Sequence, residues 1–299
     1  MASNVCMYRG GTRTNTEEVV CRRLDPLQTA MAHADVDAHG WPHVILLCSA
    51  FLHALLFWTT RRIAKKACTS YAKLPDEPER RNWDSRVVST VHAAFAVWAS
   101  IWLYRNEGHR VFGKLGMIEA DDEIFRYHNA TSQALMATSL GYFCYDLVVL
   151  YTYYPRLGGM DFLCHHITAI FCLVLSLATK KGHFIVLTAI ASEMSTPYVN
   201  LRYFLHQSGA KETKAYLLNG ILLWTVWLVS RIYMFGSVSL FMFYNYRALL
   251  KEFTPAVAYL VLIAVAILNG LSLNWFWKIT RGLVKALLHL RTGKRSKQL

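Results

Sequence analysis

Three ionisable side chains inside apolar segments are the main candidates for a reactive site in this chain: His165, His166 and Glu193. The histidine pair is followed by ITAIFCLVL at 167–175, and Glu193 lies in the next apolar stretch, within ASEMSTP at 191–197. Ionisable groups inside hydrophobic spans are costly in a bilayer and therefore indicate a functional site. We expect a histidine of the pair to act as general base or nucleophile, with Glu193 orienting it or balancing its charge.

The two adjacent histidines cannot both face one small site, because neighbouring residues on an α-helix point about 100° apart. One is expected to face the interior of a bundle, and the other to hydrogen-bond a neighbouring helix. Asp161 precedes His165 by four residues and could hold an imidazole tautomer. The spacing leaves open that both histidines only bond between helices. We expect no metal, because no i, i+4 chelating pair is present.

Five further polar residues inside the apolar segments are candidates for substrate binding: His92, Asp146, Thr196, Asn200 and Arg231. Pro197 removes the helical hydrogen bond to the carbonyl of Glu193. The resulting kink would leave a carboxylate and a free carbonyl at one depth; a purely structural kink is the alternative. Arg231, near the middle of its segment, needs a carboxylate, either Asp146 or Glu193. An internal ion pair is favoured over binding of a substrate phosphate.

The composition is that of a multi-pass membrane protein. Of the 299 residues, 54% are hydrophobic, and the formal net charge is +13. Basic residues crowd the ends of membrane helices, and here most Lys and Arg lie between apolar runs. We therefore expect membrane lipids as partners and no nucleic acid. The seven cysteines contain no C-x-x-C pair and indicate neither a disulfide framework nor a zinc cage.

Seven apolar segments come close to the roughly 20 helical residues that cross a bilayer core of about 30 Å. They are residues 43–60, 86–104, 132–153, 161–179, 184–205, 217–243 and 256–278. The expected fold class is an all-α integral membrane bundle of six to seven transmembrane helices, because backbone groups in lipid must be bonded within each segment. Excess Lys and Arg in 61–86 and from 278 onward favour a lumenal N-terminus and a cytosolic C-terminus.

In this interpretation the chain has four parts. Residues 1–41 form a polar segment expected to be disordered, and 42–81 the first transmembrane helix with a basic loop. Residues 82–285 form the main helical domain. Residues 286–299 form a basic cytosolic tail, whose end, RSKQL, resembles a dibasic endoplasmic-reticulum retrieval signal.

Four motifs follow one another along the main domain: NWDSRVVSTVHA at 82–93, GYFCYDL at 141–147, the histidine pair at 165–166, and SEMSTPYVNLR at 192–202. In order and rough spacing, this set resembles the TLC-domain family, which includes the ceramide synthases, over about residues 82–285. The resemblance implies a bundle of membrane helices, residence in the endoplasmic reticulum and a role in lipid metabolism.

In the ceramide synthases, paired histidines and a downstream His-Asp-x-x-Asp element transfer an acyl chain from acyl-CoA to a sphingoid amine. By position, the resemblance carries the pair onto His165 and His166, and the first aspartate onto Glu193. Ser192 and Thr196 stand where the element has its histidine and second aspartate. This departure argues against the ceramide-synthase reaction and leaves histidine-dependent acyl transfer to another acceptor open.

Three functions stay open on the sequence. The preferred one is a lipid-homeostasis protein that binds or modifies acyl lipids, with its status as an enzyme open. The second is an acyltransferase that moves an acyl chain from acyl-CoA, as co-substrate, to a lipid amine or hydroxyl without another cofactor. The third is a proton-coupled transporter of a lipid or solute that uses Glu193, Asp146 and Arg231. Homo- or hetero-oligomers through transmembrane helices are compatible with all three.

Overall fold

The chain folds into a bundle of long membrane helices, as the sequence predicted. The computed structural model describes residues 4–9, 18–23, 41–107 and 121–292. Six helical stretches are long and apolar enough to cross a membrane: Trp41–Ala67, Glu77–Asn106, Ala130–Thr152, Met160–Thr179, Lys214–Tyr244 and Pro255–Leu288. They contain α2 (Trp41–Ala67), α4 (Glu77–Glu107), α6 (Ala130–Thr152), α7 (Met160–Thr179), α10 (Lys214–Trp227) with α11 (Phe235–Tyr244), and α13 (Pro255–Thr292).

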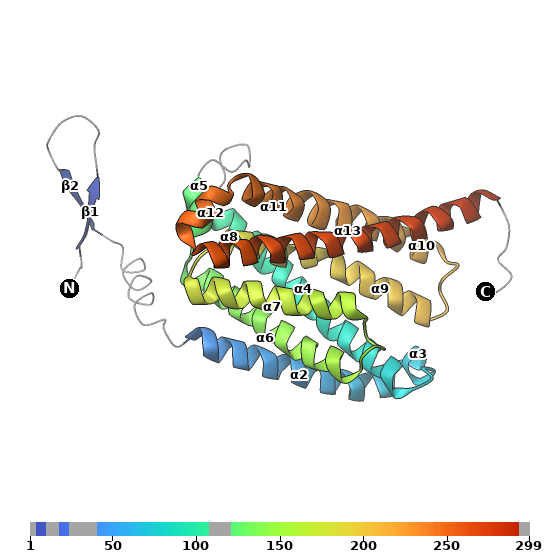
Figure 1. Cartoon of the computed structure of the whole chain (residues 1–299). Helices are drawn as coiled ribbons and strands as arrows, with labels where there is room; N and C mark the ends of the chain where they lie inside the picture. The colour runs from blue at the N-terminus through green and yellow to red at the C-terminus, as the bar shows by residue number, and fades with distance from the viewer. Residues whose placement is uncertain (1–3, 10–17, 24–40, 108–120, 293–299) are drawn as a thin grey trace.

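A seventh crossing is made by a broken helix at the predicted segment 184–205. It consists of α8 (His183–Ala191), the 3₁₀-helix η2 (Ser192–Ser195) and α9 (Thr196–Gln207). These continue one another from the end of the bundle near α5 (Asp121–Arg126) and α12 (Tyr246–Glu252) to the end near α3 (Thr69–Ala72) (Figure 1). Seven crossings place the start of α2 and the end of α13 at opposite ends of the bundle.

Three predicted boundaries were wrong, because α2 runs on to Ala67, α4 begins at Glu77 and α13 continues past 278 to Thr292. Much of 61–86 was expected to be a basic loop, whereas most of these residues are helical. Lys and Arg are good helix formers whose long stems lie along apolar surface while their charges reach water. One of them, Arg81, is buried and paired with Asp84 at 3.0 Å.

Two short strands precede the bundle, β1 (Asn4–Arg9) and β2 (Glu18–Arg23), paired antiparallel. Residues 1–41 were expected to have no regular structure, so the strand pair differs from that expectation for the part of the segment that the structure describes. The last residues of the predicted basic tail, including RSKQL, lie outside the described residues.

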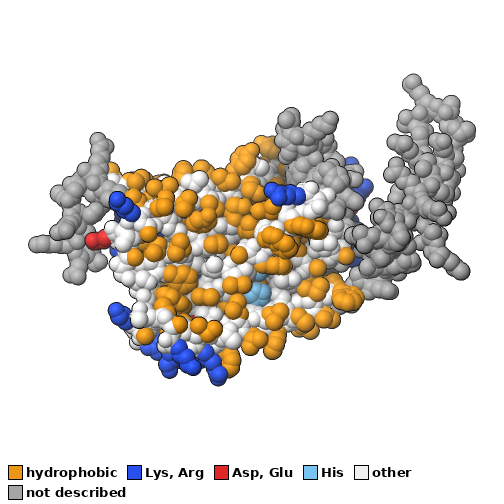
Figure 2. Space-filling view, turned by 180° about the vertical axis from the view of Figure 1, so that it is seen from behind, with side chains coloured by type: hydrophobic (Ala, Val, Ile, Leu, Met, Phe, Trp, Pro, Cys, Tyr) orange, Lys and Arg blue, Asp and Glu red, His pale blue; other side chains and the backbone are white. Residues whose placement is uncertain are grey.

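The outer surface of the bundle is apolar where lipid would surround it. Large side chains such as Trp58, Trp98, Tyr151 and Ile263 are exposed. Figure 2 shows hydrophobic side chains across the middle of one face, with Lys and Arg gathered mostly toward its ends. Exposed apolar area of this extent is unfavourable in water and typical of a lipid-facing surface.

Close packing of α2 against α6 depends on a glycine. A Cβ added at Gly141 would lie 2.4 Å from the carbonyl oxygen of Leu46 and 2.7 Å from the Cβ of Ser49. The Ser49 hydroxyl also donates a hydrogen bond of 2.6 Å to the carbonyl of Thr138. Small residues at such contacts let helix backbones approach closely in membranes. This contact fixes α6, which carries Asp146, against the first membrane helix.

Candidate functional site

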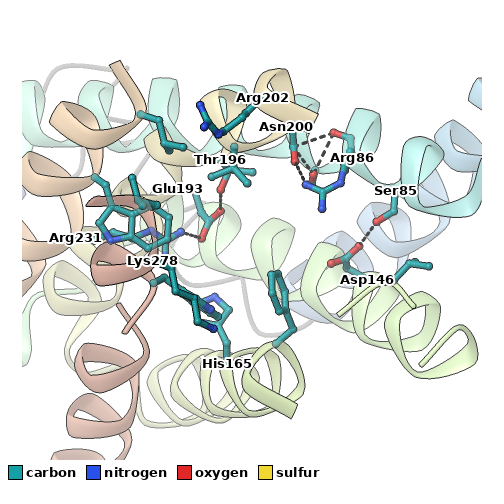
Figure 3. Close-up of a pocket in the computed structure, with 18 of the residues that line it drawn as sticks. Ser85, Arg86, Asp146, His165, Glu193, Thr196, Asn200, Arg202, Arg231 and Lys278 are labelled. Carbon is teal, nitrogen blue, oxygen red and sulfur yellow. Dashed lines mark hydrogen bonds and ion pairs between the residues drawn. The ribbon is translucent and has the colours of Figure 1, made fainter. Parts of the chain in front are cut away.

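A cavity of about 410 Å³ lies inside the bundle, between α4, α6 and α7 on one side and η2, α9, α10 and α13 on the other. Its lining includes Leu157 in the α6–α7 connection and Leu283 near the end of α13. The cavity therefore approaches the end of the bundle that carries the C-terminal end of α13 (Figure 1). Figure 3 shows polar residues of its lining, among them His165, Glu193 and Arg231.

His166 is held by hydrogen bonds at both ring nitrogens. Its Nε2 lies 2.9 Å from Oδ2 of Asp146, and its Nδ1 lies 2.9 Å from the carbonyl oxygen of Phe162. Both partners are acceptors when Asp146 is ionised, so both ring nitrogens must carry a proton. The other carboxylate oxygen of Asp146 accepts a bond of 3.0 Å from the Ser85 hydroxyl. With Asp146 ionised, His166 is an imidazolium in a buried ion pair and has no lone pair with which to act as a base or nucleophile.

Both histidines line the cavity, but the ring of His165 is not held by hydrogen bonds as that of His166 is. The Nδ1 of His165 has no hydrogen-bond partner among the described residues. Its ring lies among aromatic neighbours, 5.5 Å from the ring of Trp275 and 6.3 Å from that of Phe143 between centroids. A neutral imidazole without a hydrogen-bond partner keeps a lone pair. The two histidines therefore differ in their contacts, and their division into separate tasks stays a prediction.

Glu193 and Arg231 form an ion pair at the cavity wall. Arg231 Nη2 donates to Glu193 Oε1 at 2.8 Å, and Arg231 Nε donates to the Ser195 hydroxyl at 2.9 Å. The Thr196 hydroxyl donates to Glu193 Oε2 at 2.5 Å. Both carboxylate oxygens thus have partners (Figure 3). Of the two carboxylates predicted for Arg231, the structure selects Glu193.

Both members of this pair sit where the helix geometry is irregular. Glu193 lies in the 3₁₀-helix η2, just before the helix in which Pro197 occupies the first turn. The prediction of a free carbonyl at Glu193 was wrong, because the backbone N–H of Thr196 bonds to it in the tighter 3₁₀ pattern. Arg231 lies in a π-helix, η3 (Leu228–Met234), between α10 and α11. Such segments occur frequently at functional sites.

Asn200 joins α9 to α4 at the cavity wall. Its amide nitrogen lies 3.0 Å from the carbonyl of Arg86, 2.8 Å from the Ser89 hydroxyl and 2.9 Å from that of Thr90. Its oxygen accepts a bond of 3.1 Å from Arg86 Nη1. Asn200 therefore lines the cavity, as expected of a binding residue, and also positions an arginine.

Two expectations are not met by the geometry. Asp161 does not hold a histidine: its Oδ2 accepts from Trp275 Nε1 at 2.8 Å and lies 3.5 Å from Lys278 Nζ. Asp146, from the neighbouring helix, bonds to the other histidine, His166. His92 is buried, stacks on Tyr142 at 3.9 Å between ring centroids, and lines neither of the two cavities described. The structure therefore does not bring His92 into the site.

A second, apolar cavity of about 100 Å³ adjoins the first. The two share four lining residues: Phe143, His165, Glu193 and Arg231. From there the second cavity runs between α7, α8, α11 and α13 to Lys181 and Phe253. Lys181 forms an ion pair of 2.9 Å with Glu252 at that end. His165 thus stands where a polar cavity meets an apolar one.

The comparison with known families agrees with this architecture. A family model described as TLC domain matches residues 82–281. The chain belongs to the TLC-domain family. The matched region contains every polar residue of the site discussed above. The motif resemblance noted in the sequence is therefore confirmed at the level of the family.

Several curated relatives cover much of this TLC-domain chain. TLC domain-containing protein 4-B of Danio rerio is 25% identical over 269 residues, which are 85% of this chain and 93% of the relative. TLC domain-containing protein 4 of Homo sapiens is 25% identical over 228 residues, 73% of this chain and 80% of the relative. Topoisomerase I damage affected protein 4 of Saccharomyces cerevisiae is 29% identical over 168 residues, 53% of this chain and 58% of the relative.

Sequence reasoning missed two arginines that line the cavity of this TLC-domain protein, Arg86 and Arg202. Both lie inside the motifs quoted for the family, but near the ends of apolar segments, where a basic residue is ordinary. Nothing in their local sequence separates them from the other basic residues at helix ends. Only the packing of α4 against α9 shows that Arg86 turns inward.

Proposed function

We propose that this protein binds an acyl lipid across the two adjoining cavities and acts on it through His165. The observation that carries the proposal is the position of His165 at the junction, with a polar cavity on one side and an apolar one on the other. An acyl chain fits the apolar part by burial of its methylene groups, each contributing about 0.8 kcal/mol. The reactive carbonyl would then lie beside the imidazole.

The chemistry that fits this arrangement is acyl transfer from a thioester. One imidazole nitrogen of His165 attacks the carbonyl carbon, the carbon–sulfur bond breaks, and the leaving thiolate takes the proton of the other imidazole nitrogen. A lipid amine or hydroxyl then attacks the acyl-imidazole and gives its proton to the imidazole as the acyl–nitrogen bond breaks, so that neutral His165 is regenerated. The His166–Asp146 pair positions this helix segment, and Arg231 supplies positive charge beside the developing oxyanion.

Lipid binding without turnover is the second candidate, and one observation favours it. Both oxygens of Glu193 have partners in Arg231 and Thr196, so this carboxylate offers no free base next to His165. A protein of this kind would influence lipid composition by binding and presenting acyl lipids. Either candidate is a role in lipid homeostasis.

We also propose that the protein resides in the endoplasmic-reticulum membrane with the C-terminal end of α13 and the cavity opening toward the cytosol. The support is the basic character of that end, where α2 finishes with Lys65 and Lys66 and α13 carries Lys278 and Arg281. Accessibility of tags at the two termini to protease, in sealed microsomes, tests the orientation. Digestion of the N-terminal tag alone would contradict it.

The decisive experiment gives the purified full-length protein labelled palmitoyl-CoA in nanodiscs containing lipid acceptors. Catalysis is supported if wild type transfers the acyl group to a lipid and carries an acyl adduct, and if His165→Ala shows neither. Cys164→Ser is the matched control, since it removes the adjacent exposed thiol that could be acylated spontaneously. Saturable binding without adduct or product, unaffected by His165→Ala, would leave only the lipid-binding function. Absence of both binding and transfer would refute the proposal.

A further inference from the structure

The cavity carries more positive than negative charge. Two of its cationic groups are matched within the site: Arg231 by Glu193, and the His166 imidazolium by Asp146. Lys278 lies 3.5 Å from Asp161. The remaining two cations that line it, Arg86 and Arg202, have no carboxylate partner among the described residues. A cavity with two unmatched guanidinium groups favours an anionic ligand.

Arg86 is fixed in place by neutral groups only. Its Nε donates to Asn82 Oδ1 at 2.9 Å and its Nη1 to Asn200 Oδ1 at 3.1 Å, while its guanidinium lies 4.4 Å from the ring centroid of Tyr203. The carboxylate of Glu79 is engaged by the Tyr203 hydroxyl at 3.1 Å. Arg86 therefore keeps N–H groups without a partner, on a side chain whose direction is set by three neighbours, of which Figure 3 shows Asn200.

Arg202 is held against α10 at a glycine. Its guanidinium lies 4.1 Å from the ring centroid of Tyr216, and a Cβ added at Gly220 would lie 2.8 Å from its Nη1. A side chain at position 220 would therefore push the guanidinium away. Stacking on an aromatic face leaves the edge of a guanidinium, with its N–H groups, free to meet an anion.

We propose that Arg86 and Arg202 recognise phosphate on the acyl ligand of this cavity. The inference rests on the proposed function, since it concerns the polar end of the same ligand. Guanidinium groups match phosphate oxygens in geometry and form charge-assisted hydrogen bonds with them. Phosphate of this kind is present on the coenzyme A part of an acyl thioester and on the headgroup of a lysophospholipid. A neutral acyl lipid lacks it and would leave both arginines unmatched.

The test measures equilibrium binding of three palmitoyl ligands to the full-length protein in nanodiscs of neutral lipid. The ligands are palmitoyl-CoA, palmitoyl-lysophosphatidate and the phosphate-free palmitoyl-N-acetylcysteamine thioester; free coenzyme A is measured beside them. The variants are Arg86→Gln, Arg202→Gln and Gly220→Ala. Arg281→Gln is the matched control, because it removes the same charge from an exposed position on α13 that does not line the cavity.

We expect Arg86→Gln and Arg202→Gln each to raise the dissociation constant of the phosphate-bearing ligands by about tenfold to a hundredfold, because each variant loses hydrogen bonds to a charged group. Gly220→Ala should act in the same direction as Arg202→Gln. Binding of the phosphate-free thioester should stay unchanged, as should all binding to Arg281→Gln. The phosphate-bearing ligand that wild type prefers identifies the source of the phosphate.

The opposing outcomes are distinct. If the arginine variants weaken the binding of all three acyl ligands alike, or of none of them, phosphate recognition is refuted. The proposed acyl binding still stands in that case if wild type binds the phosphate-free thioester. If wild type binds free coenzyme A as tightly as palmitoyl-CoA and does not bind the phosphate-free thioester, acyl binding is refuted. Phosphate recognition then stands if the arginine variants lose coenzyme A.

Discussion

Replacement of Asp146 should separate the two histidines in their roles. In Asp146→Ala the imidazolium of His166 loses its counter-charge, and the Ser85 hydroxyl loses its acceptor. Removing one partner of a buried ion pair costs about 3–5 kcal/mol. Asp146→Asn should cost only about 1–2 kcal/mol, because its amide can donate to Nε2 of a neutral His166 while its oxygen still accepts from Ser85.

The assay is reversible unfolding in mixed detergent micelles, followed by tryptophan fluorescence, together with ¹⁵N shifts of labelled histidine at neutral pH. Wild type should show both nitrogens of His166 protonated, and Asp146→Asn should show a bare Nε2. Asp161→Asn is the control, since its carboxylate faces Lys278 near the surface, where a pair contributes about 0–1 kcal/mol. A bare Nε2 on His166 in wild type would refute the reasoning.

Three further changes probe the scaffold. Gly141→Ala should lower the free energy of unfolding by about 1–3 kcal/mol through overpacking between α2 and α6, whereas Gly270→Ala, with open space around its Cβ, should not; equal losses would contradict the packing argument. Asn129→Ala should remove the side chain that caps α6 and lower the free energy of unfolding by about 1 kcal/mol in the same assay. The hydrogen bond from Lys181 lowers the pKa of Glu252 from its ordinary 4.5. The ionised Glu252 should therefore stabilise the fold fully above pH 4.5, and this stabilisation should be lost as the pH falls through the lowered pKa. Glu252→Gln should flatten this acid limb of the unfolding midpoint, and an unchanged limb would count against it.

The positions of the membrane helices could be predicted because they follow from local composition. Runs of apolar residues of sufficient length mark the crossings, and Pro197 marks the break in the one between 184 and 205. The helix ends could not be placed as well, because charged residues at 61–67 and 77–86 continue their helices beyond the apolar runs.

The partners within the site were harder to predict, because they depend on how helices rotate against one another. The i, i+4 rule pointed to Asp161 as the partner of a histidine, but the partner is Asp146, on the preceding helix. Arg231 could be limited to two carboxylates from its need for a counter-charge, and the structure chose between them. No sequence signal announced the π-helix that carries it.

That π-helix has a consequence for how chains of this family can differ in length. A π turn accommodates one residue more than an α turn over the same rise, so Leu228–Met234 amounts to a single-residue insertion inside a membrane helix. Because the π turn absorbs the extra residue, deleting one residue there would restore a regular α-helix while α10 and α11 keep their facing. The change would fall on the turn that carries Arg231, whose side chain would lose its direction toward Glu193. A one-residue gap in an alignment, usually assigned to a loop, would here mark the loss of a buried charge.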